Sequence, residues 1–262
     1  MKQIEFADRT KKILEGDHSV IGLAVGGSWL TNEMDEFSDL DLILVTKDKI
    51  TDDKTKMLGF ANRFGELLSG FTGEHVGEPR VLICLYDHPL LHVDIKFVTL
   101  EEFHSRIETP AILLDTDGQL QNALSQSTAK FPYPDYQWIE DRLWIWIHYA
   151  LLKIGRGEYV EAFDFLGFLR MVVLGPLLHI KSGNLPRGVR KVETQLKEED
   201  FNALKLTLPV YERKSLIVSL RNSVVIYRKL RTSLFDNSII LQSETEQKVM
   251  IYFEEIEQDN GK

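Results

Sequence analysis

The chain has 262 residues, of which 44% are hydrophobic and 27% charged, and its formal net charge is −9. This ordinary globular composition supplies enough apolar residues for the cores of one or two domains. The acidic balance argues against a nucleic-acid partner, because binding to its backbone requires clustered Lys and Arg. A cationic small molecule remains compatible with this charge.

The single cysteine, Cys84, lies in an apolar run, so no intrachain disulfide and no cysteine zinc site can form. The first residues lack the apolar core of a signal peptide. No uninterrupted apolar run approaches the roughly 20 residues that span a bilayer. We therefore expect a cytoplasmic protein that does not span a membrane.

The first half of the chain alternates helical and strand patterns. Residues 3–15 predict a helix that ends at Gly16, and the apolar run 20–25 predicts a buried strand. A second strand is expected at 39–45. Apolar residues then recur at helical spacing over 57–71, which predicts a helix there.

The next segment has the pattern of a β-hairpin followed by a helix. Two strand-like runs, 80–86 and 91–98, are joined by a turn around Pro89. Thr99 and Glu102 then have the spacing of a capping box, which predicts that a helix begins there.

The pattern changes near residue 130, where Pro132 and Pro134 punctuate the chain. Beyond them only helical periodicity remains, in three apolar stripes. We therefore expect an α+β protein. Residues 1–130 would form a mixed sheet with helices, and residues 131–262 a helical bundle domain.

Two aspartates lie at the start of one of the predicted strands. Asp39 and Asp41 lie two residues apart, so on a strand they point to the same face, about 7 Å apart along the backbone. Two such charges side by side repel each other unless a cation lies between them. Oxygen-only ligands suit Mg²⁺, which binds carboxylates together with substrate phosphates. Solvated strand-edge residues are the alternative.

A third carboxylate, Asp94, lies on the second strand of the hairpin. The alternation there places His92, Asp94 and Lys96 on one face. An aspartate between apolar neighbours needs a partner, which could be Lys96, Arg80 across the hairpin, or a metal held by the first two carboxylates. Three carboxylates would permit two metal ions.

A glycine-rich turn precedes these carboxylates. Gly26, Gly27 and Ser28 follow the strand at 20–25, and a short helix is expected to begin at Trp29. Glycines let backbone N–H groups approach a phosphate, and a helix N-terminus favours anions. The Ser28 hydroxyl can donate to a phosphate oxygen as well.

Gly27-Ser28, Asp39-x-Asp41 and the distant Asp94 together resemble the nucleotidyltransferase superfamily that includes DNA polymerase beta. The resemblance covers roughly residues 20–165. It implies that Asp39 and Asp41 are metal ligands, that Asp94 is a third ligand or the general base, and that Gly27 and Ser28 bind phosphate.

The second half extends the resemblance to the small-molecule branch of that superfamily. The segment from Trp144 through Lys153 to Glu158 is similar to a helical segment of the streptomycin-modifying adenylyltransferases. Lys153 would add a point charge that could meet the triphosphate. The alternative is that Lys153 is an ordinary surface lysine.

These observations predict transfer of a nucleoside monophosphate, with AMP from ATP the first candidate, to a hydroxyl of a small molecule. The resemblance to the small-molecule branch, which contains the aminoglycoside and lincosamide nucleotidyltransferases, implies such an antibiotic as a candidate acceptor. Asp94, Glu78 and Glu140 are candidates for the base that takes the hydroxyl proton. The acceptor and nucleotide are expected between the two domains, a common place for ligands. The alternative is a nucleotide-binding regulatory or antitoxin-like protein that acts on a protein partner.

Overall fold

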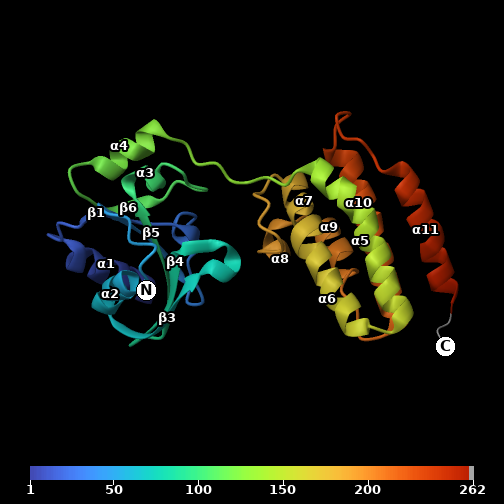
Figure 1. The fold of residues 1–262 in the computed structure, drawn as a ribbon, viewed down its shortest axis with the longest axis horizontal. Helices are drawn as coiled ribbons and strands as arrows, with labels where there is room; N and C mark the ends of the chain where they lie inside the picture. Colours follow the sequence, from blue (N-terminus) through green and yellow to red (C-terminus); the bar gives the residue numbers. More distant parts are fainter. Residues whose placement is uncertain (260–262) are drawn as a thin grey trace. The chain divides into compact units, whose positions relative to one another are not determined.

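The chain forms two compact units, Met1–Phe131 and a second that begins at Pro132. The computed structural model describes residues 1–259. The first unit combines a β-sheet with helices, and the second is built of helices (Figure 1). The α+β class predicted from the sequence is confirmed.

A mixed sheet forms the centre of the first unit. Its strands are β1 (Val20–Val25), β2 (Leu40–Thr46), β3 (Glu66–Gly73), β4 (Glu78–Asp87), β5 (Leu91–Thr99) and β6 (Ala111–Asp115). The strand order is β3-β4-β5-β2-β1-β6. β2 and β5 pair in parallel, and the other neighbours pair antiparallel. The two strands that carry the predicted carboxylates are therefore adjacent at the middle of the sheet.

Helices cover the two faces of this sheet unequally. α1 (Lys2–Leu14) and α2 (Lys54–Phe64) pack on one face, over the larger of the unit's two apolar clusters. α3 (Leu100–Phe103) and α4 (Gln119–Gln126) lie on the other face, over a smaller cluster (Figure 1). Asp41 and Asp94 belong to this second face and stay partly exposed.

Several elements agree with the sequence patterns. The first helix ends at Leu14, two residues before Gly16, whose φ is 83°. The strand at 20–25 and the hairpin of β4 with β5 are present. The capping box at Thr99 and Glu102 is complete, with each side chain bonded to the backbone of the other.

The helix expected over residues 57–71 is wrong in its second half. α2 ends at Phe64, and the chain turns at Gly65 into the edge strand β3. Pairing of β3 with β4 overrides the helical spacing of the apolar residues, two of which, Leu68 and Phe71, are exposed on this edge. The strand β6, which pairs with β1, was not predicted.

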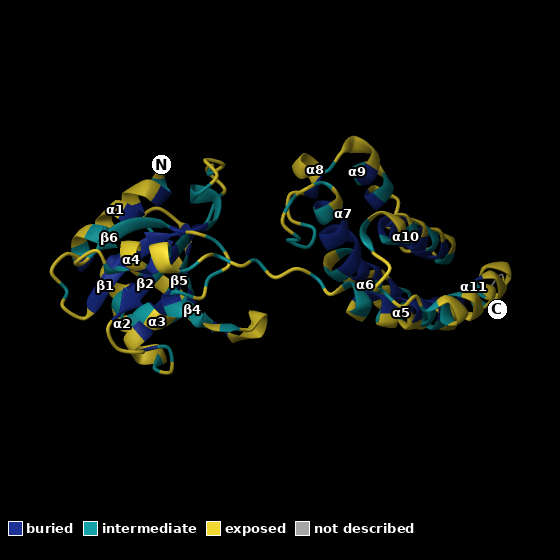
Figure 2. Cartoon of the chain, turned by 90° about the horizontal axis from the view of Figure 1, so that it is seen from above, coloured by how far each residue is buried: buried dark blue, intermediate teal, exposed yellow. Residues whose placement is uncertain are grey.

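The second unit is a set of helices around one apolar core, drawn dark blue in Figure 2. Its helices are α5 (Tyr136–Arg156), α6 (Tyr159–Leu169), η3 (Arg170–Leu174), α7 (Gly175–Lys181), α8 (Val192–Gln195), α9 (Glu198–Lys205), α10 (Arg213–Leu234) and α11 (Ser243–Gln258). By length and composition alone, the continuous helical stretch Tyr159–Lys181 could cross a bilayer. Half of its most apolar window is buried in the helical unit, as in a core helix.

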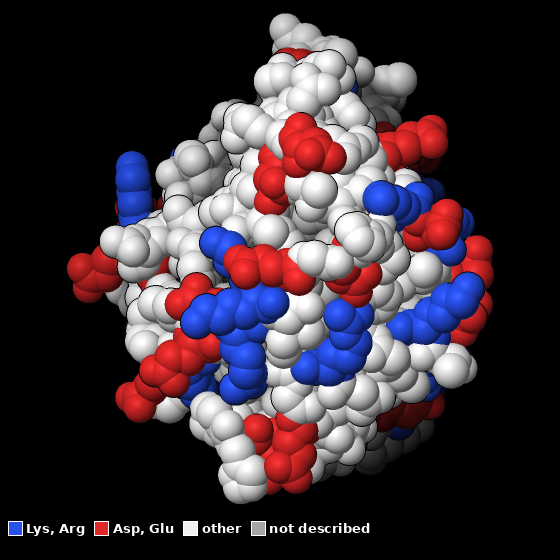
Figure 3. Space-filling view, turned by 90° about the vertical axis from the view of Figure 1, so that its left-hand side faces the viewer, with Lys and Arg blue, Asp and Glu red and all other residues white. Residues whose placement is uncertain are grey.

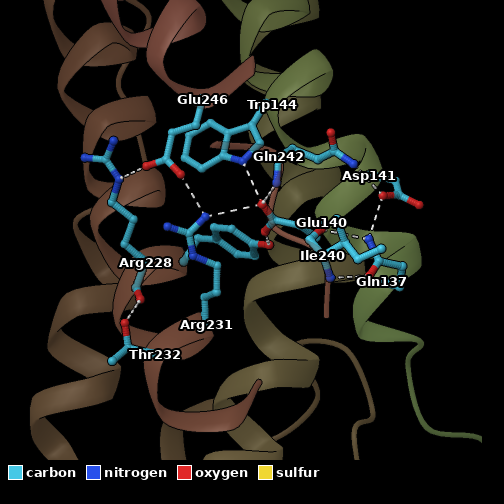
Figure 4. Close-up of polar contacts among 11 residues, drawn as sticks. Gln137, Glu140, Asp141, Trp144, Arg228, Arg231, Thr232, Ile240, Gln242 and Glu246 are labelled. Atoms are coloured by element: carbon cyan, nitrogen blue, oxygen red, sulfur yellow. Dashed lines mark hydrogen bonds and ion pairs between the residues drawn. The ribbon is translucent and has the colours of Figure 1, made fainter. Parts of the chain in front are cut away.

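A buried carboxylate joins three of these helices. Glu140 of α5 is fully buried, and the side chains of Trp144, Tyr227 and Arg231 all direct hydrogen-bond donors to it (Figure 4). The backbone N–H of Gln242 donates to the same carboxylate at 3.0 Å. Burial, followed by the hydrogen bond to Glu140, raises the pKa of Tyr227. The carboxylate is thus a satisfied structural group at the junction of α5, α10 and the start of α11.

Replacing Glu140 with Ala should lower the free energy of unfolding of the second unit by about 3 kcal/mol, because the donors around it lose their buried partner. Urea titration followed by tryptophan fluorescence measures this, since Trp138, Trp144 and Trp146 all lie in α5. Glu254→Ala, at an exposed position of α11, is the matched control and should change stability by less than about 0.5 kcal/mol. Equal effects of the two substitutions would contradict the structural role of Glu140.

Candidate functional site

Asp41 and Asp94 are direct neighbours across two parallel strands. The register of β2 with β5 pairs these two residues, so their side chains leave the same face of the sheet on strands about 4.8 Å apart. Asp39 lies immediately before β2 and is partly exposed. The structure therefore brings Asp41 together with Asp94 and places Asp39 at the entry to the same strand.

The loop that leads into Asp39 is anchored by a buried glutamine that the sequence patterns did not identify. The Gln3 amide of α1 donates to the backbone oxygens of Asp35 and Ser38, at 2.9 and 2.7 Å. Gln3 itself is fully buried. This contact fixes the backbone from which Asp39 projects.

Gly27 lies directly against the Asp41 carboxylate. Its φ is 62°, and a Cβ at this position would come within 1.9 Å of Asp41 Oδ2. The N–H of Gly26 donates to the backbone oxygen of Asp41 at 2.9 Å, which locks the turn onto β2. Only glycine fits here, for both conformational and steric reasons.

The helix expected at Trp29 is a single 3₁₀ turn, η1 (Gly27–Trp29). A single turn lacks the row of aligned peptides that gives a longer helix its macrodipole. The predicted attraction of anions by a helix dipole is therefore not available here. Anion binding at this turn would depend on individual N–H groups and on the Ser28 hydroxyl.

A glutamate from a distant loop accepts a hydrogen bond from one of these N–H groups. The Gly27 N–H donates to Glu108 Oε1 at 2.8 Å, across 81 residues of sequence. A carboxylate oxygen thus lies where the motif would offer its N–H to a phosphate oxygen. No local spacing marks Glu108, because only the return of the chain along β6 brings it to the turn.

The face of β5 carries a chain of polar contacts, as its alternation predicted. His92 Nε2 lies 2.9 Å from Asp94 Oδ1. Lys96 Nζ pairs with Glu78 at 2.8 Å, and the Arg80 guanidinium pairs with the same carboxylate at 2.7 Å. The structure thus gives Asp94 a neighbour that was not suggested, His92. Lys96 and Arg80, which were suggested, both contact Glu78.

These contacts rank the three candidates for a general base. Hydrogen bonding from Arg80, and then from Lys96, lowers the pKa of Glu78 to about 2, which makes it a weak proton acceptor. Glu140 is buried and saturated by donors in the helical core. Asp94 remains as the partly exposed candidate beside Asp41.

Lys153 lies at the C-terminal end of α5, in the second unit. Its Nζ pairs with Glu158 at 2.8 Å and with Glu161 at 3.0 Å, and its side chain is 14% exposed. The hydrogen bond to Glu158, followed by that to Glu161, raises its pKa, so the ammonium group is charged at neutral pH. Its contact with a triphosphate stays a prediction.

A second group of possible metal ligands lies on the two strands at the β3–β4 edge of the sheet. Atoms of Glu66, Asp87 and His88 lie within 4.8 Å of one another, beside the β4–β5 turn. Two of the three are exposed, and exposed acidic groups of this kind are common without a metal ion.

Comparison with known proteins gives only distant similarities. No protein-family model and no curated protein sequence matches the chain. The structure is similar to the crystal structure of an aminoglycoside 6-adenyltransferase from Bacillus subtilis, at 17% identity and a TM-score of 0.41 over 99% of this chain and 98% of that one. It is also similar to a nucleotidyltransferase-like protein from Exiguobacterium sibiricum, at 13% identity and a TM-score of 0.36 over 97% and 81%. The geometry of the site, rather than these scores, supports the functional argument.

Gly27→Ala should destabilise the first unit and disrupt the turn, because the new methyl group meets both an unfavourable φ and the Asp41 carboxylate. Gly16→Ala is the matched control, since Gly16 has a φ of 83° but nothing within 4 Å of its Cβ position. The control should cost about 1 kcal/mol for backbone strain alone, and Gly27→Ala clearly more. Thermal melts of both variants measure the difference, and equal losses would show that the close contact with Asp41 is unimportant.

Proposed function

We propose that the chain is a metal-dependent nucleotidyltransferase that transfers a nucleoside monophosphate, AMP from ATP in the first instance, to a hydroxyl of a small molecule. One observation supports this above the others: Asp41 and Asp94 are paired across β2 and β5, with Gly27 packed against Asp41. The motif residues, which come from three separate segments of the sequence, thus lie together on one face of the central strands.

The donor set fits a divalent cation. Asp41 and Asp94 present carboxylates from adjacent strands, Asp39 lies directly before β2, and all three are partly exposed. Carboxylate pairs of this kind repel each other without a cation, and oxygen ligands suit Mg²⁺. When bound there, Mg²⁺ would neutralise the phosphates of the nucleotide.

The residues around the carboxylates have separate roles in this proposal. Gly27 N–H and Ser28 Oγ would bind phosphate oxygens, which requires Glu108 to leave the Gly27 N–H. Asp94 would accept the proton of the acceptor hydroxyl as its oxygen attacks the α-phosphorus. The new oxygen–phosphorus bond forms as the bond to pyrophosphate breaks. His92 would orient the Asp94 carboxylate through their 2.9 Å contact.

The helical unit, residues 131–262 in the expected division, would contribute to the choice of acceptor, and Lys153 is the lysine that would meet the triphosphate. A small-molecule acceptor agrees with the charge distribution, because basic and acidic side chains lie interspersed on the face in Figure 3 and form no continuous basic tract for nucleic acid. The chain would act in the cytoplasm, and its resemblance makes an aminoglycoside or lincosamide one candidate acceptor.

Asp41→Asn should abolish nucleotide transfer while leaving the metal-free protein as stable as the wild type or more so, because one of two neighbouring charges is removed. Incubation with labelled ATP, Mg²⁺ and a panel of hydroxyl compounds, including aminoglycosides and lincosamides, measures transfer, and thermal melts measure stability. Asp8→Asn, at an exposed position of α1, should change neither. A large stability loss in Asp41→Asn would mean that the carboxylate is structural. Nucleotide binding by wild type without transfer to any compound would favour a regulatory protein instead.

Ser28→Ala should weaken nucleotide binding, whereas Glu108→Gln should not. Ser28→Ala removes a hydrogen bond to a charged group and should weaken ATP binding by about 1–2 kcal/mol. Glu108→Gln removes a negative charge that competes for the Gly27 N–H, so it should leave ATP binding equal or tighter. Calorimetry with Mg²⁺ and ATP measures both. Weaker binding in Glu108→Gln would show that Glu108 supports the nucleotide rather than competing with it.

A further inference from the structure

A charged cavity opens on the first unit beside the proposed site. Its volume is about 710 Å³, and it lies between β4, β5, the chain after α3 and the chain after α4. Its walls carry four cationic side chains against two carboxylates: Arg80, Lys96, Arg106, Lys130, Glu78 and Glu101. Several serine and threonine hydroxyls complete the lining. This cavity is cationic in a chain whose net charge is −9.

The cavity and the glycine turn flank the paired carboxylates on opposite sides. Lys96 lines the cavity and follows Asp94 by two residues on β5, so both side chains lie on one face about 7 Å apart along the strand. In the strand order β4-β5-β2-β1, the cavity borders β4 and β5, whereas Gly27 follows β1. A triphosphate on the Gly27 side therefore leaves the cavity side for the acceptor.

Hydrogen bonds hold one wall of the cavity in place. Arg106 donates to Ser127 Oγ at 2.6 Å and to the His104 backbone oxygen at 3.4 Å. The backbone N–H of Lys130 donates in turn to the Arg106 oxygen at 2.9 Å. These bonds tie the chain after α3 to the chain after α4 and hold the backbone of Lys130 at the cavity.

The cations of the cavity differ in how far they are already neutralised. Glu78 pairs with both Arg80 and Lys96, so that one carboxylate faces two cations. Lys130 is exposed and forms no ion pair within residues 1–259. An anion entering the cavity would meet the positive charges of Lys130 and Arg106 together with hydroxyl donors, the combination that binds phosphate.

We propose that this cavity binds a phosphate monoester carried by the acceptor, which places an acceptor hydroxyl at Asp94. The proposal rests on the proposed function and specifies its substrate class as a phosphorylated small molecule such as a sugar phosphate. The hydroxyl oxygen bonds to the α-phosphorus, its proton passes to Asp94, and pyrophosphate leaves; the acceptor's own phosphate takes no part. A cavity of this size suits such a compound, since ligand sites commonly enclose 300–1,000 Å³.

Binding of inorganic phosphate to the full chain tests the cavity without any catalysis. In ¹H–¹⁵N NMR spectra at constant ionic strength, phosphate should shift amides of residues 104–107 and 125–130 in a saturable way. Lys130→Glu should weaken this binding at least tenfold. Lys12→Glu, the same charge change at an exposed position of α1, should leave it intact. Shifts that are absent, spread over the surface, or equally weakened in both variants would overturn the assignment.

Transfer from labelled ATP to matched pairs of compounds tests the substrate class. Each pair shares one scaffold, such as glucose and glucose 6-phosphate, and differs only in the phosphate. The phosphorylated member should be the better acceptor, and Lys130→Glu should raise its KM at least tenfold with little change in kcat. Preference for the unphosphorylated member would overturn the proposal. Phosphate binding in the cavity without transfer to any compound would contradict the proposed function instead. The cavity would then be an anion-binding site that does not serve nucleotide transfer.

Discussion

The parallel pairing of β2 with β5 is the constraint on which the site depends. Residues 47–90 separate these strands in the sequence, yet their register places Asp41 opposite Asp94. Two carboxylates at this spacing are unfavourable unless they are compensated, so the pairing must be enforced by something other than the site. The apolar side chains of both strands, packed under α1 and α2, provide that enforcement.

The same alternation that buries one face of these strands exposes the chemistry on the other. Leu40, Leu42 and Val93 point into the core under α1 and α2, so Asp41 and Asp94 must point away from it. Gly27 completes the arrangement, because the turn after β1 can approach Asp41 only without a side chain. Core packing and site geometry are therefore two consequences of one strand register.

The segment between α3 and β6 links the two sides of the site. Arg106 builds the wall of the cationic cavity, and Glu108, two residues later, accepts the Gly27 N–H. A single short stretch thus contacts the cavity where we place the acceptor and the turn where we place the triphosphate.

The sequence alone determined the local parts: the α+β class, the strand at 20–25, the β4–β5 hairpin and the one-sided placement of His92, Asp94 and Lys96. Each depends on spacing within a short window. It did not determine β3, because strand pairing overrode helical spacing, nor the contact of Glu108 with Gly27, because 81 residues separate them. Only the tertiary structure decided which carboxylates are neighbours and which base candidates are neutralised or buried, since register, burial and ion pairing arise from segments that meet only in the folded chain.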